Sequence, residues 1–376
     1  MLWTFVVFSV LYYLFVVFLI TFWNRETVRP EEPVAGEYPL VSVVIAVRNE
    51  EETIGCLIDG LAHQQYPADR FEVIIVDDGS MDDTLEVVQA KGRHLSCELK
   101  IGISGTDQIT GSGKKAALSK GIEMARGELI MVTDGDCRVG SQWISVMSAW
   151  FLKQKADFLA GPVSLKVTGG FWQSLQALEF ASLTGAAGAF LQAGKPLFCN
   201  GANMAFTIDA YDAVEGHARG RMMASGDDVY LMQSIHASGR KVSFVKDIRA
   251  LVQTMPLSRW HDFFHQRNRW AGKWNKFQGV FALLLPVFLF FYYLIMVTAL
   301  IFAIVGWFNW LVFLFLIAVK VIVDYIYLKK VVNFLRNKLN IGIFVLASLG
   351  YAFYALFFGI SSNLTGFQWK GRKYRR

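Results

Sequence analysis

Long apolar segments constrain this chain more than any other feature. A run from residue 277 to residue 319 contains no Asp, Glu, Lys, Arg or His, and residues 277–327 are long enough for two membrane spans of about 20 residues each. Residues 2–23 and 341–361 are further apolar segments, and 54% of all residues are hydrophobic, which exceeds the range of soluble domains. We therefore expect a membrane protein with a C-terminal transmembrane region over residues 277–361 and one soluble domain over residues 38–250.

The charges beside these segments indicate how the chain is oriented. The first segment has no basic residue before it and no A-x-A-like cleavage site, which favours a retained anchor over residues 1–24 rather than a cleaved signal peptide. Arg25 and Arg29 follow it, so the positive-inside rule places the soluble domain on the cytoplasmic side of the cell (inner) membrane. The same rule favours a cytoplasmic basic tail over residues 362–376, although three spans after the soluble domain would place that tail outside. A bent or re-entrant segment at Gly350 and Gly359 would reconcile the two arguments.

The cysteines and the net charge exclude several classes of protein. The four cysteines are isolated, without metal-ligand or redox spacing, and we expect ordinary buried thiols at Cys56, Cys97, Cys137 and Cys199. The formal charge of +6 is concentrated beside apolar segments, which suits anionic lipid headgroups. No pattern indicates a nucleic-acid partner.

The soluble domain alternates short apolar runs with helical patterns. The runs "LVSVVIAV" (40–47), "FEVIIV" (71–76), "LKIGIS" (99–104) and "ELIMVT" (128–133) are rich in β-branched residues, and segments with helical spacing of apolar residues lie between them. This alternation predicts an α/β domain with a mostly parallel sheet and helices on both faces. In such sheets ligands bind at the carboxyl ends of the strands.

Polar residues gather at three of these strand ends. Asp134 and Asp136 flank Gly135 after the fourth run and offer hard oxygen ligands to a Mg²⁺ or Mn²⁺ ion that bridges to a diphosphate, although the same residues are common in turns. An Asp of "DDGS" (77–80) can accept a nucleobase N–H while Glu50 reaches the base or ribose, or it can cap the next helix.

Two helix starts also carry charged pairs. Lys114 and Lys115 follow glycines in "GSGKKA". This segment fits neither a dinucleotide fingerprint nor a Walker A loop. The two lysines can offset the charge of a diphosphate at the start of a helix, or they are simply solvated. Asp227 and Asp228 begin an amphipathic helix. Their negative charges either interact favourably with the positive end of the helix macrodipole, or one of them is the general base that deprotonates an acceptor hydroxyl.

The segment "HDFFH" nearly matches the zinc-protease pattern H-E-x-x-H. Its Asp is shorter than the usual Glu, and no third ligand stands near His261 and His265 in the sequence. We interpret residues 251–276 instead as interfacial amphipathic helices with their Phe side chains in lipid.

Read in order, seven motifs resemble the series of membrane-bound glycosyltransferase family 2, which are inverting enzymes of GT-A fold. The motifs are "VIAVRNEEETIG", "VIIVDDGSMDDT", "GKKAAL", "TDGD", "GAN", "GDDVYL" and "QRNRW". They cover about residues 38–275. The tail sequence "FQWKGRKY" is similar to the C-terminus of some lipid-modifying members.

The resemblance implies contacts to the donor. Glu50 and Asp78 would contact the nucleoside, in most members uridine, and Lys114 and Lys115 would lie at the phosphates. Asp134 and Asp136 match the D-x-D motif, with Asp136 favoured as the direct ligand of Mg²⁺ or Mn²⁺.

The resemblance also implies the catalytic base and an acceptor entrance. Asp228 matches the base, and Asp227 is a looser match because the family more often has Glu there. Gln266, Arg269 and Trp270 match Q-x-x-R-W, in which the Arg pairs with the departing diphosphate and the Trp lines the acceptor entrance.

These matches predict a hexosyltransferase that moves a sugar from a UDP-sugar to a membrane lipid acceptor or a short glycan. Few spans and no accessory domain favour this reading over a processive polysaccharide synthase. An inactive-transferase subunit of a polysaccharide export system is the other alternative, because fold resemblance alone does not establish activity.

Overall fold

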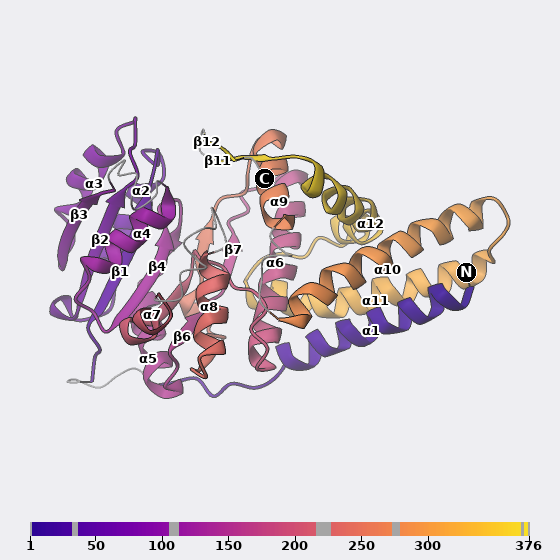
Figure 1. The fold of residues 1–376 in the computed structure, drawn as a ribbon, viewed down its shortest axis with the longest axis horizontal. Coiled ribbons are helices and arrows are strands. Elements are labelled where there is room, and N and C mark those ends of the chain that lie inside the picture. Colours follow the sequence, from indigo (N-terminus) through magenta and orange to yellow (C-terminus); the bar gives the residue numbers. More distant parts are fainter. Residues whose placement is uncertain are drawn as a thin grey trace. The chain divides into compact units, whose positions relative to one another are not determined.

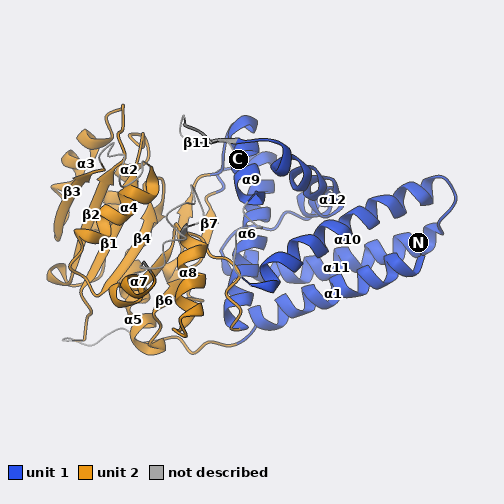
Figure 2. Ribbon diagram, viewed as in Figure 1, with its two compact units in different colours: residues 1–25, 167–193, 256–376 blue, residues 26–166, 194–255 orange. Residues whose placement is uncertain are grey.

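The chain forms two compact units, and each unit is built from segments that are far apart in the sequence (Figure 2). The computed structural model describes residues 2–31, 37–104, 113–215, 227–272, 279–369 and 372–374. Unit 2 consists of Glu26–Lys166 and Gly194–Met255, and unit 1 consists of Met1–Arg25, Val167–Ala193 and Pro256–Arg376.

Unit 2 contains a seven-stranded sheet with the order β3-β2-β1-β4-β8-β6-β9 (Figure 1). Its strands are β1 (Val41–Val47), β2 (Phe71–Asp77), β3 (Glu98–Ile103), β4 (Leu129–Asp134), β6 (Phe158–Ala160), β8 (Met204–Thr207) and β9 (Val242–Phe244). β1 to β4 are parallel and lie where the sequence predicts strands, whereas β8 is antiparallel to β4 and β6. The mostly parallel α/β sheet is therefore confirmed.

The other elements of unit 2 flank this sheet or form a second, smaller one. The helices are α2 (Ile54–Ala62), η1 (Ala68–Arg70), α3 (Thr84–Gly92), α4 (Lys114–Glu123), α5 (Trp143–Gln154), α7 (Ile208–Glu215), α8 (Asp227–Ala237) and η3 (Ile248–Ala250). The second sheet has the order β5-β10-β7 and comprises β5 (Arg138–Val139), β7 (Val163–Leu165) and β10 (Val252–Thr254).

The sequence pattern of β1 explains its central place. Val43, Val44 and Ile45 have no exposed surface, and successive strand residues point to opposite faces, so both faces of the sheet are covered. Helix α4 packs on β1 and β2, and a Cβ atom at Gly121 would lie 2.5 Å from Val44 Cγ1. The glycine thus lets α4 approach the sheet closely, which positions the lysines at the start of this helix.

A buried carboxylate connects the first three strands. Glu72 on β2 is 1% exposed and accepts hydrogen bonds from Ser42 Oγ at 2.7 Å and from the backbone N of Arg126 at 2.7 Å. Its Oε2 also pairs with Lys100 Nζ at 2.7 Å. Burial alone would raise the pKa of Glu72, but the hydrogen bonds from Lys100, Ser42 and Arg126 outweigh it and lower the pKa below its usual value.

We predict that Glu72→Gln destabilises unit 2 in a pH-dependent way. A hydrogen bond to a charged group is worth about 1.5–3 kcal/mol, and the cations left behind, Lys100 and Arg126, are 21% and 58% exposed. Because the pKa of Glu72 is lower in the folded than in the unfolded protein, its stabilisation is present above the unfolded-state pKa of about 4.3 and is lost as the pH falls through the folded-state pKa. The difference in thermal midpoint between wild type and Glu72→Gln should therefore be large at pH 7 and narrow below about pH 4.

The matched control for this prediction is Glu98→Gln. Glu98 pairs with the same Arg126 but its side chain is 48% exposed, so its loss should change stability by less than about 1 kcal/mol. A constant difference between wild type and Glu72→Gln from pH 7 to pH 3.5 would contradict the linkage argument.

Unit 1 consists mainly of long helices. Its elements are α1 (Leu2–Trp23), α6 (Phe171–Gln192), α9 (Trp260–Ala271), α10 (Val280–Ile304), α11 (Trp310–Phe334), α12 (Ile341–Leu364) and the hairpin of β11 (Phe367–Trp369) with β12 (Arg372–Tyr374). Helices α1, α10 and α11 lie side by side (Figure 1). With α12 they are the four helices of the described chain that are long and apolar enough to cross a membrane.

Helix α12 covers the segment that the sequence suggested to be bent or re-entrant. It continues through Gly350 and Gly359 as one helix, since a glycine in a helix interior costs only about 1 kcal/mol. A Cβ atom at Gly359 would lie 2.9 Å from Phe290 Cδ2 on α10, so this glycine makes room for a neighbouring helix. Tail residues 370, 371, 375 and 376 lie outside the described residues.

Helix α11 continues past residue 319, where the charge-free run ends, and the charges that it then contains are paired. Lys320 Nζ donates to Asp324 Oδ2 at 2.7 Å and to Ser348 Oγ at 3.1 Å. The Tyr12 hydroxyl donates to Asp324 Oδ1 at 2.8 Å. These bonds connect α1, α11 and α12 within the apolar helices, where an unpaired charge would be costly.

Helix α6 belongs to unit 1 although it lies within residues 38–250 of the sequence. It packs against α1 and α11. Its Gln, Ser and Glu residues make α6 less apolar than a typical span, whereas its small residues suit close helix packing. A Cβ atom at Gly185 would lie 2.5 Å from Val331 Cγ2 and 2.6 Å from Tyr327 Oη.

We predict that Gly185→Ala lowers the thermal midpoint of the detergent-purified protein. The added methyl group would force α6 and α11 apart, and overpacking of this kind costs about 1–3 kcal/mol. The control is Gly350→Ala, where a Cβ atom would meet nothing within 4 Å and where loss of a helical glycine stabilises by up to about 1 kcal/mol. Equal midpoints for the two variants would contradict the close contact.

Candidate active site

Three polar clusters predicted from the sequence lie at one edge of the sheet. β2, β1 and β4 are parallel neighbours, with Val47 paired to Asp77 and Ala46 paired to Asp134. After β1 the chain forms β2 and β3 on one side and then returns to β4 on the other side of β1. This reversal of strand order is the place where open α/β sheets bind ligands.

Glu50 packs against the glycine of the D-G-D sequence. A Cβ atom at Gly135 would lie 3.0 Å from Val47 Cγ1 and 3.3 Å from Glu50 Cγ. Thr53 Oγ1 donates to Glu50 Oε2 at 2.8 Å, which orients the carboxylate. Glu50 and the two flanking aspartates therefore share one region, and any larger residue at 135 would separate them.

The two acids after β2 have different partners. Asp77 accepts hydrogen bonds from the backbone N of Gly79 and of Ser80, both at 3.0 Å, and so shapes the turn. Asp78 is 4% exposed, and its Oδ1 accepts from the backbone N of Gly113 at 3.1 Å. Asp77 thus stabilises the turn after β2, while Asp78 connects the end of β2 to the start of α4.

The lysines and the D-G-D carboxylates also meet at this edge. Lys114 Nζ forms an ion pair with Asp134 Oδ1, and Lys115 follows it as the second residue of α4, half-buried. Asp136 Oδ2 accepts from Thr254 Oγ1 of β10 at 3.1 Å. Sequence reasoning missed Thr254, because β10 is a strand of three residues and carries no periodic pattern.

The side chains present fit a divalent cation. Asp134 and Asp136 provide carboxylate oxygens, which Mg²⁺ and Mn²⁺ prefer as ligands, and both are half-buried at the strand end. Such ions usually retain several positions for water and phosphate oxygens. Within the described residues, no three His, Cys, Asp or Glu side chains are grouped to hold a metal ion.

The candidate base, Asp228, is held by the "GAN" motif. The backbone N of Gly201 donates to Asp228 Oδ2 at 3.0 Å. Asn203 of the same motif is fully buried; it accepts from Trp143 Nε1 at 3.0 Å and donates to the carbonyls of Pro162 and Ala250 at 2.8 Å. The motif thus fixes Asp228 to the core of unit 2.

Its neighbour Asp227 begins α8. The side chain of Asp227 lies outside what the structure describes, so its predicted part in catalysis stays a prediction.

The Q-x-x-R-W motif lies on α9 in unit 1. Gln266 Oε1 accepts from Arg267 Nη1, and the Trp270 ring lies 6.1 Å from the ring of Phe180 on α6. Arg269 is on the same helix and is half-buried. Sequence reasoning singled out Gln266, Arg269 and Trp270 but passed over Arg267, which is 3% exposed.

The aromatic residues of α9 differ in burial: Trp260 is 56% exposed and Phe264 is partly exposed. Phe263 is 4% exposed, and its ring centre lies 4.7 Å from that of Trp172. The Phe264 ring lies 5.9 Å from the ring of Phe358 on α12. Aromatic side chains of α6 and α12 therefore contact α9 at Phe263 and Phe264, and the prediction of an interfacial helix stays a prediction.

The two histidines of α9 contact each other rather than a metal-ligand set. His265 Nε2 lies 3.1 Å from His261 Nε2, a hydrogen-bond distance that requires one ring to donate and the other to accept. Burial and the neighbouring His261 lower the pKa of His265.

A mostly parallel sheet with a D-x-D sequence at its switch point is typical of the GT-A fold. The sequence matches "Glycosyltransferase like family 2" over residues 39–273. The chain belongs to this family.

Known proteins similar to this chain agree with the assignment. It is 33% identical over 132 residues to Glycosyltransferase AglE of Haloferax volcanii, which covers 35% of this chain and 42% of that protein. It is 29% identical over 152 residues to Beta-monoglucosyldiacylglycerol synthase of Nostoc sp., which covers 40% of this chain and 32% of that protein. The chain thus spans less than half the length of these curated relatives.

A solved structure of similar fold is that of mannosyltransferase PcManGT from Pyrobaculum calidifontis, in complex with GDP-Man and Mn²⁺. The TM-score is 0.58 at 17% identity, over 96% of this chain and 95% of that one. This likeness confirms the predicted GT-A fold.

Proposed function

We propose that this protein is an inverting hexosyltransferase that moves a sugar from a UDP-sugar to a membrane lipid or a short glycan. The observation that carries the proposal is the convergence of Glu50, Asp78, Lys114 and the D-G-D carboxylates at one edge of the sheet. Donors with a nucleoside and a diphosphate need this combination of acceptors and cations. The hydrogen bond that holds Asp228 supports its assignment as the base.

The reaction that these residues support is a single displacement. Asp228 takes the proton of the acceptor hydroxyl while the hydroxyl oxygen forms a bond to the anomeric carbon. The bond between that carbon and the diphosphate oxygen breaks, and the negative charge passes to the departing UDP. Lys114, Lys115 and Arg269 would offset this charge.

Two further groups would bind the donor. Glu50 and Asp78 would orient the nucleoside at the switch point. A Mg²⁺ or Mn²⁺ ion held by Asp136, with Asp134, would supply additional positive charge to the diphosphate.

A lipid acceptor is supported by two observations. The same chain carries four helices that are apolar enough to span a membrane, and the Nostoc relative is by its name a Beta-monoglucosyldiacylglycerol synthase. An acceptor held in the bilayer would reach Gln266 and Trp270 if α9 lies at the membrane interface, as its motif resemblance suggests.

The test is a product assay with the purified full chain in lipid nanodiscs. Several UDP-sugars, with GDP-mannose as the competing donor class, are supplied with Mn²⁺ or Mg²⁺, and products are identified by mass spectrometry. Addition of a single hexose to a lipid, from a UDP-sugar, is the expected result. A ladder of repeats would identify a processive synthase, and no turnover of any sugar nucleotide would favour an inactive-transferase subunit.

The cysteines offer a test of the proposed cytoplasmic location. The expectation of four buried thiols is corrected: Cys137 and Cys199 are buried, Cys97 is partly exposed and Cys56 on α2 is exposed. Burial, with smaller effects of Glu72 and Glu98, raises the pKa of Cys97 to about 11, so that little reactive thiolate forms at neutral pH.

We predict that Cys56 reacts with a membrane-impermeant maleimide only after cells are permeabilised. The exposed thiol is accessible from the compartment that contains unit 2, and the proposal places that compartment inside the cell. The measurement is mass spectrometry of labelled peptides, with a Cys56→Ser variant as the control. Labelling of Cys56 in intact cells would contradict the cytoplasmic placement.

A further inference from the structure

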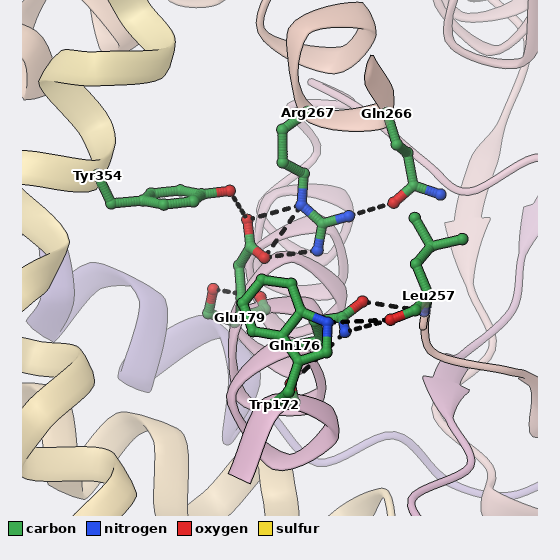
Figure 3. Close-up of polar contacts among 8 residues, drawn as sticks. Trp172, Gln176, Glu179, Leu257, Gln266, Arg267 and Tyr354 are labelled. Atoms are coloured by element: carbon green, nitrogen blue, oxygen red, sulfur yellow. Dashed lines mark hydrogen bonds and ion pairs between the residues drawn. The ribbon is translucent and has the colours of Figure 1, made fainter. Parts of the chain in front are cut away.

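The second residue of the Q-x-x-R-W motif is a buried cation with a dedicated partner. Arg267 Nη2 donates to Glu179 Oε2 at 2.6 Å, and Arg267 Nε lies 3.1 and 3.2 Å from the two carboxylate oxygens (Figure 3). The Tyr354 hydroxyl of α12 also donates to Glu179. Glu179 is the only charged residue of α6, so an otherwise uncharged helix carries one acid opposite this arginine.

The same guanidinium contacts two of the three residues that define the motif. Its Nη1 donates to Gln266 Oε1, and its central carbon lies 4.6 Å from the centre of the Trp270 ring. A planar guanidinium can donate along its edges and stack with its face at the same time. Arg267 thereby orients an amide on one side and an indole on the other.

Helix α6 also holds the chain that leads into α9. Trp172, Gln176 and Glu179 are spaced so that they share one face of α6. Gln176 Nε2 donates to the carbonyl of Leu257 at 2.9 Å and Gln176 Oε1 accepts from its backbone N at 3.0 Å. Trp172 Nε1 donates to the same carbonyl at 3.0 Å. One face of α6 therefore fixes α9 both before its start and at its middle (Figure 3).

We propose that Glu179 and Arg267 are positioning residues for sugar transfer: their buried pair holds the Gln266 amide and the Trp270 indole in the orientation that the transition state of sugar transfer requires. The inference rests on the proposed function, which assigns Gln266 and Trp270 to the site. If the pair only joined two helices, its removal would change stability without a specific effect on the rate of transfer.

The test removes the pair without leaving a charge unpaired. The double variant Glu179→Leu/Arg267→Met replaces both groups with apolar side chains, a change that is often neutral for stability. The matched control is Lys320→Met/Asp324→Leu, which removes a pair that is also buried, on α11 of the same unit. The Arg267→Lys variant keeps the charge beside Glu179 but lacks the planar group that serves Gln266 and Trp270.

We expect loss of the pair to change kcat and to leave KM nearly unchanged. Loss of the pair should lower kcat for sugar transfer by about 10- to 100-fold, because a displacement of 1 Å from the productive geometry can reduce the rate about 100-fold. KM for the donor and the thermal midpoint should stay close to those of the control variant. Arg267→Lys should fold and lose about 10-fold in kcat, since its ammonium cannot stack and donate in the same way, and it provides the test if the double variant does not fold.

Two results would overturn the positioning role. One is a kcat in both Arg267 variants equal to that of the control. The other is unchanged hydrogen–deuterium exchange over residues 260–271 when the pair is removed, since loss of the pair should raise exchange in α9 and the control should not. The exchange measurement needs no turnover, so a wild-type protein that transfers no sugar would refute the proposed function by itself.

Discussion

Asp228→Asn should abolish nearly all sugar transfer while leaving donor binding intact. The amide has the shape of the carboxylate but cannot take the acceptor proton, and removing a general base lowers rates by about 10²- to 10⁴-fold. The hydrogen bond from the backbone N of Gly201 at 3.0 Å can be accepted equally well by the amide oxygen, so the fold should tolerate the change. KM for the donor should change by less than about threefold, because the base acts on the acceptor in the transition state.

The matched control for this prediction is Asp209→Asn. Asp209 is an exposed acid in the first turn of α7 in the same unit, so it shares the favourable position of Asp228 near a helix N-terminus. If the charge of Asp228 only interacts favourably with the macrodipole of α8, both variants should transfer sugar at similar rates and show equally small shifts in thermal midpoint. An Asp228→Asn protein that retains a tenth or more of wild-type kcat would assign the base elsewhere.

Asp136→Asn should weaken the binding of divalent metal and remove most of the activity. A bound cation stabilises developing charge on a diphosphate by several kcal/mol, so we expect kcat to fall by about 100- to 1,000-fold. The Mn²⁺ concentration for half-maximal residual activity should rise, because an amide oxygen is a weaker ligand than a carboxylate. Titration of Mn²⁺ by calorimetry in the presence of UDP measures the same loss without turnover.

The Thr254→Val variant tests whether the activity depends on the Asp136 carboxylate itself or on the hydrogen bond that orients it. It removes the hydroxyl that donates to Asp136 Oδ2 at 3.1 Å but keeps the carboxylate and the shape of the side chain. We expect only a small loss, up to about 10-fold in kcat, since one hydrogen bond to a charged group is worth about 1.5–3 kcal/mol at most and the carboxylate remains available. An Asp136→Asn protein with wild-type Mn²⁺ dependence would refute the assignment of Asp136 as metal ligand.

The parts of the fold that could be predicted are those whose pattern is local. β1 and β2 are rich in β-branched residues and are buried on both faces, and such runs are recognisable without structure. β6, β7, β9 and β10 have three residues each, which is too short for a period to show. The grouping of helix α6 with unit 1 could not be predicted, because its small and polar residues reduce its hydrophobicity.

The candidate site was predictable to the extent that it follows from sheet topology. Residues after parallel neighbouring strands must lie at one edge, so the clustering of Glu50, Asp78 and Asp134 could be anticipated. The pairing of Arg267 with Glu179 could not, because the two residues are 88 positions apart and meet only through the packing of α6 on α9. A single acid in an otherwise uncharged helix was the one signal available.

The catalytic unit is interrupted in the sequence by α6, and this arrangement has a consequence for how the protein is made. During synthesis the ribosome releases β1 to β7 first, then α6, and only afterwards β8, which completes the sheet between β4 and β6. The transferase sheet therefore cannot close until a helix that packs with α1 and α11 has been produced. Cutting away residues 1–25 and 256–376 would leave α6 without these partners and would not yield a soluble enzyme. The maturation of the catalytic unit is thus tied to the assembly of the membrane helices, and a chain that fails to assemble them is not expected to release a free transferase.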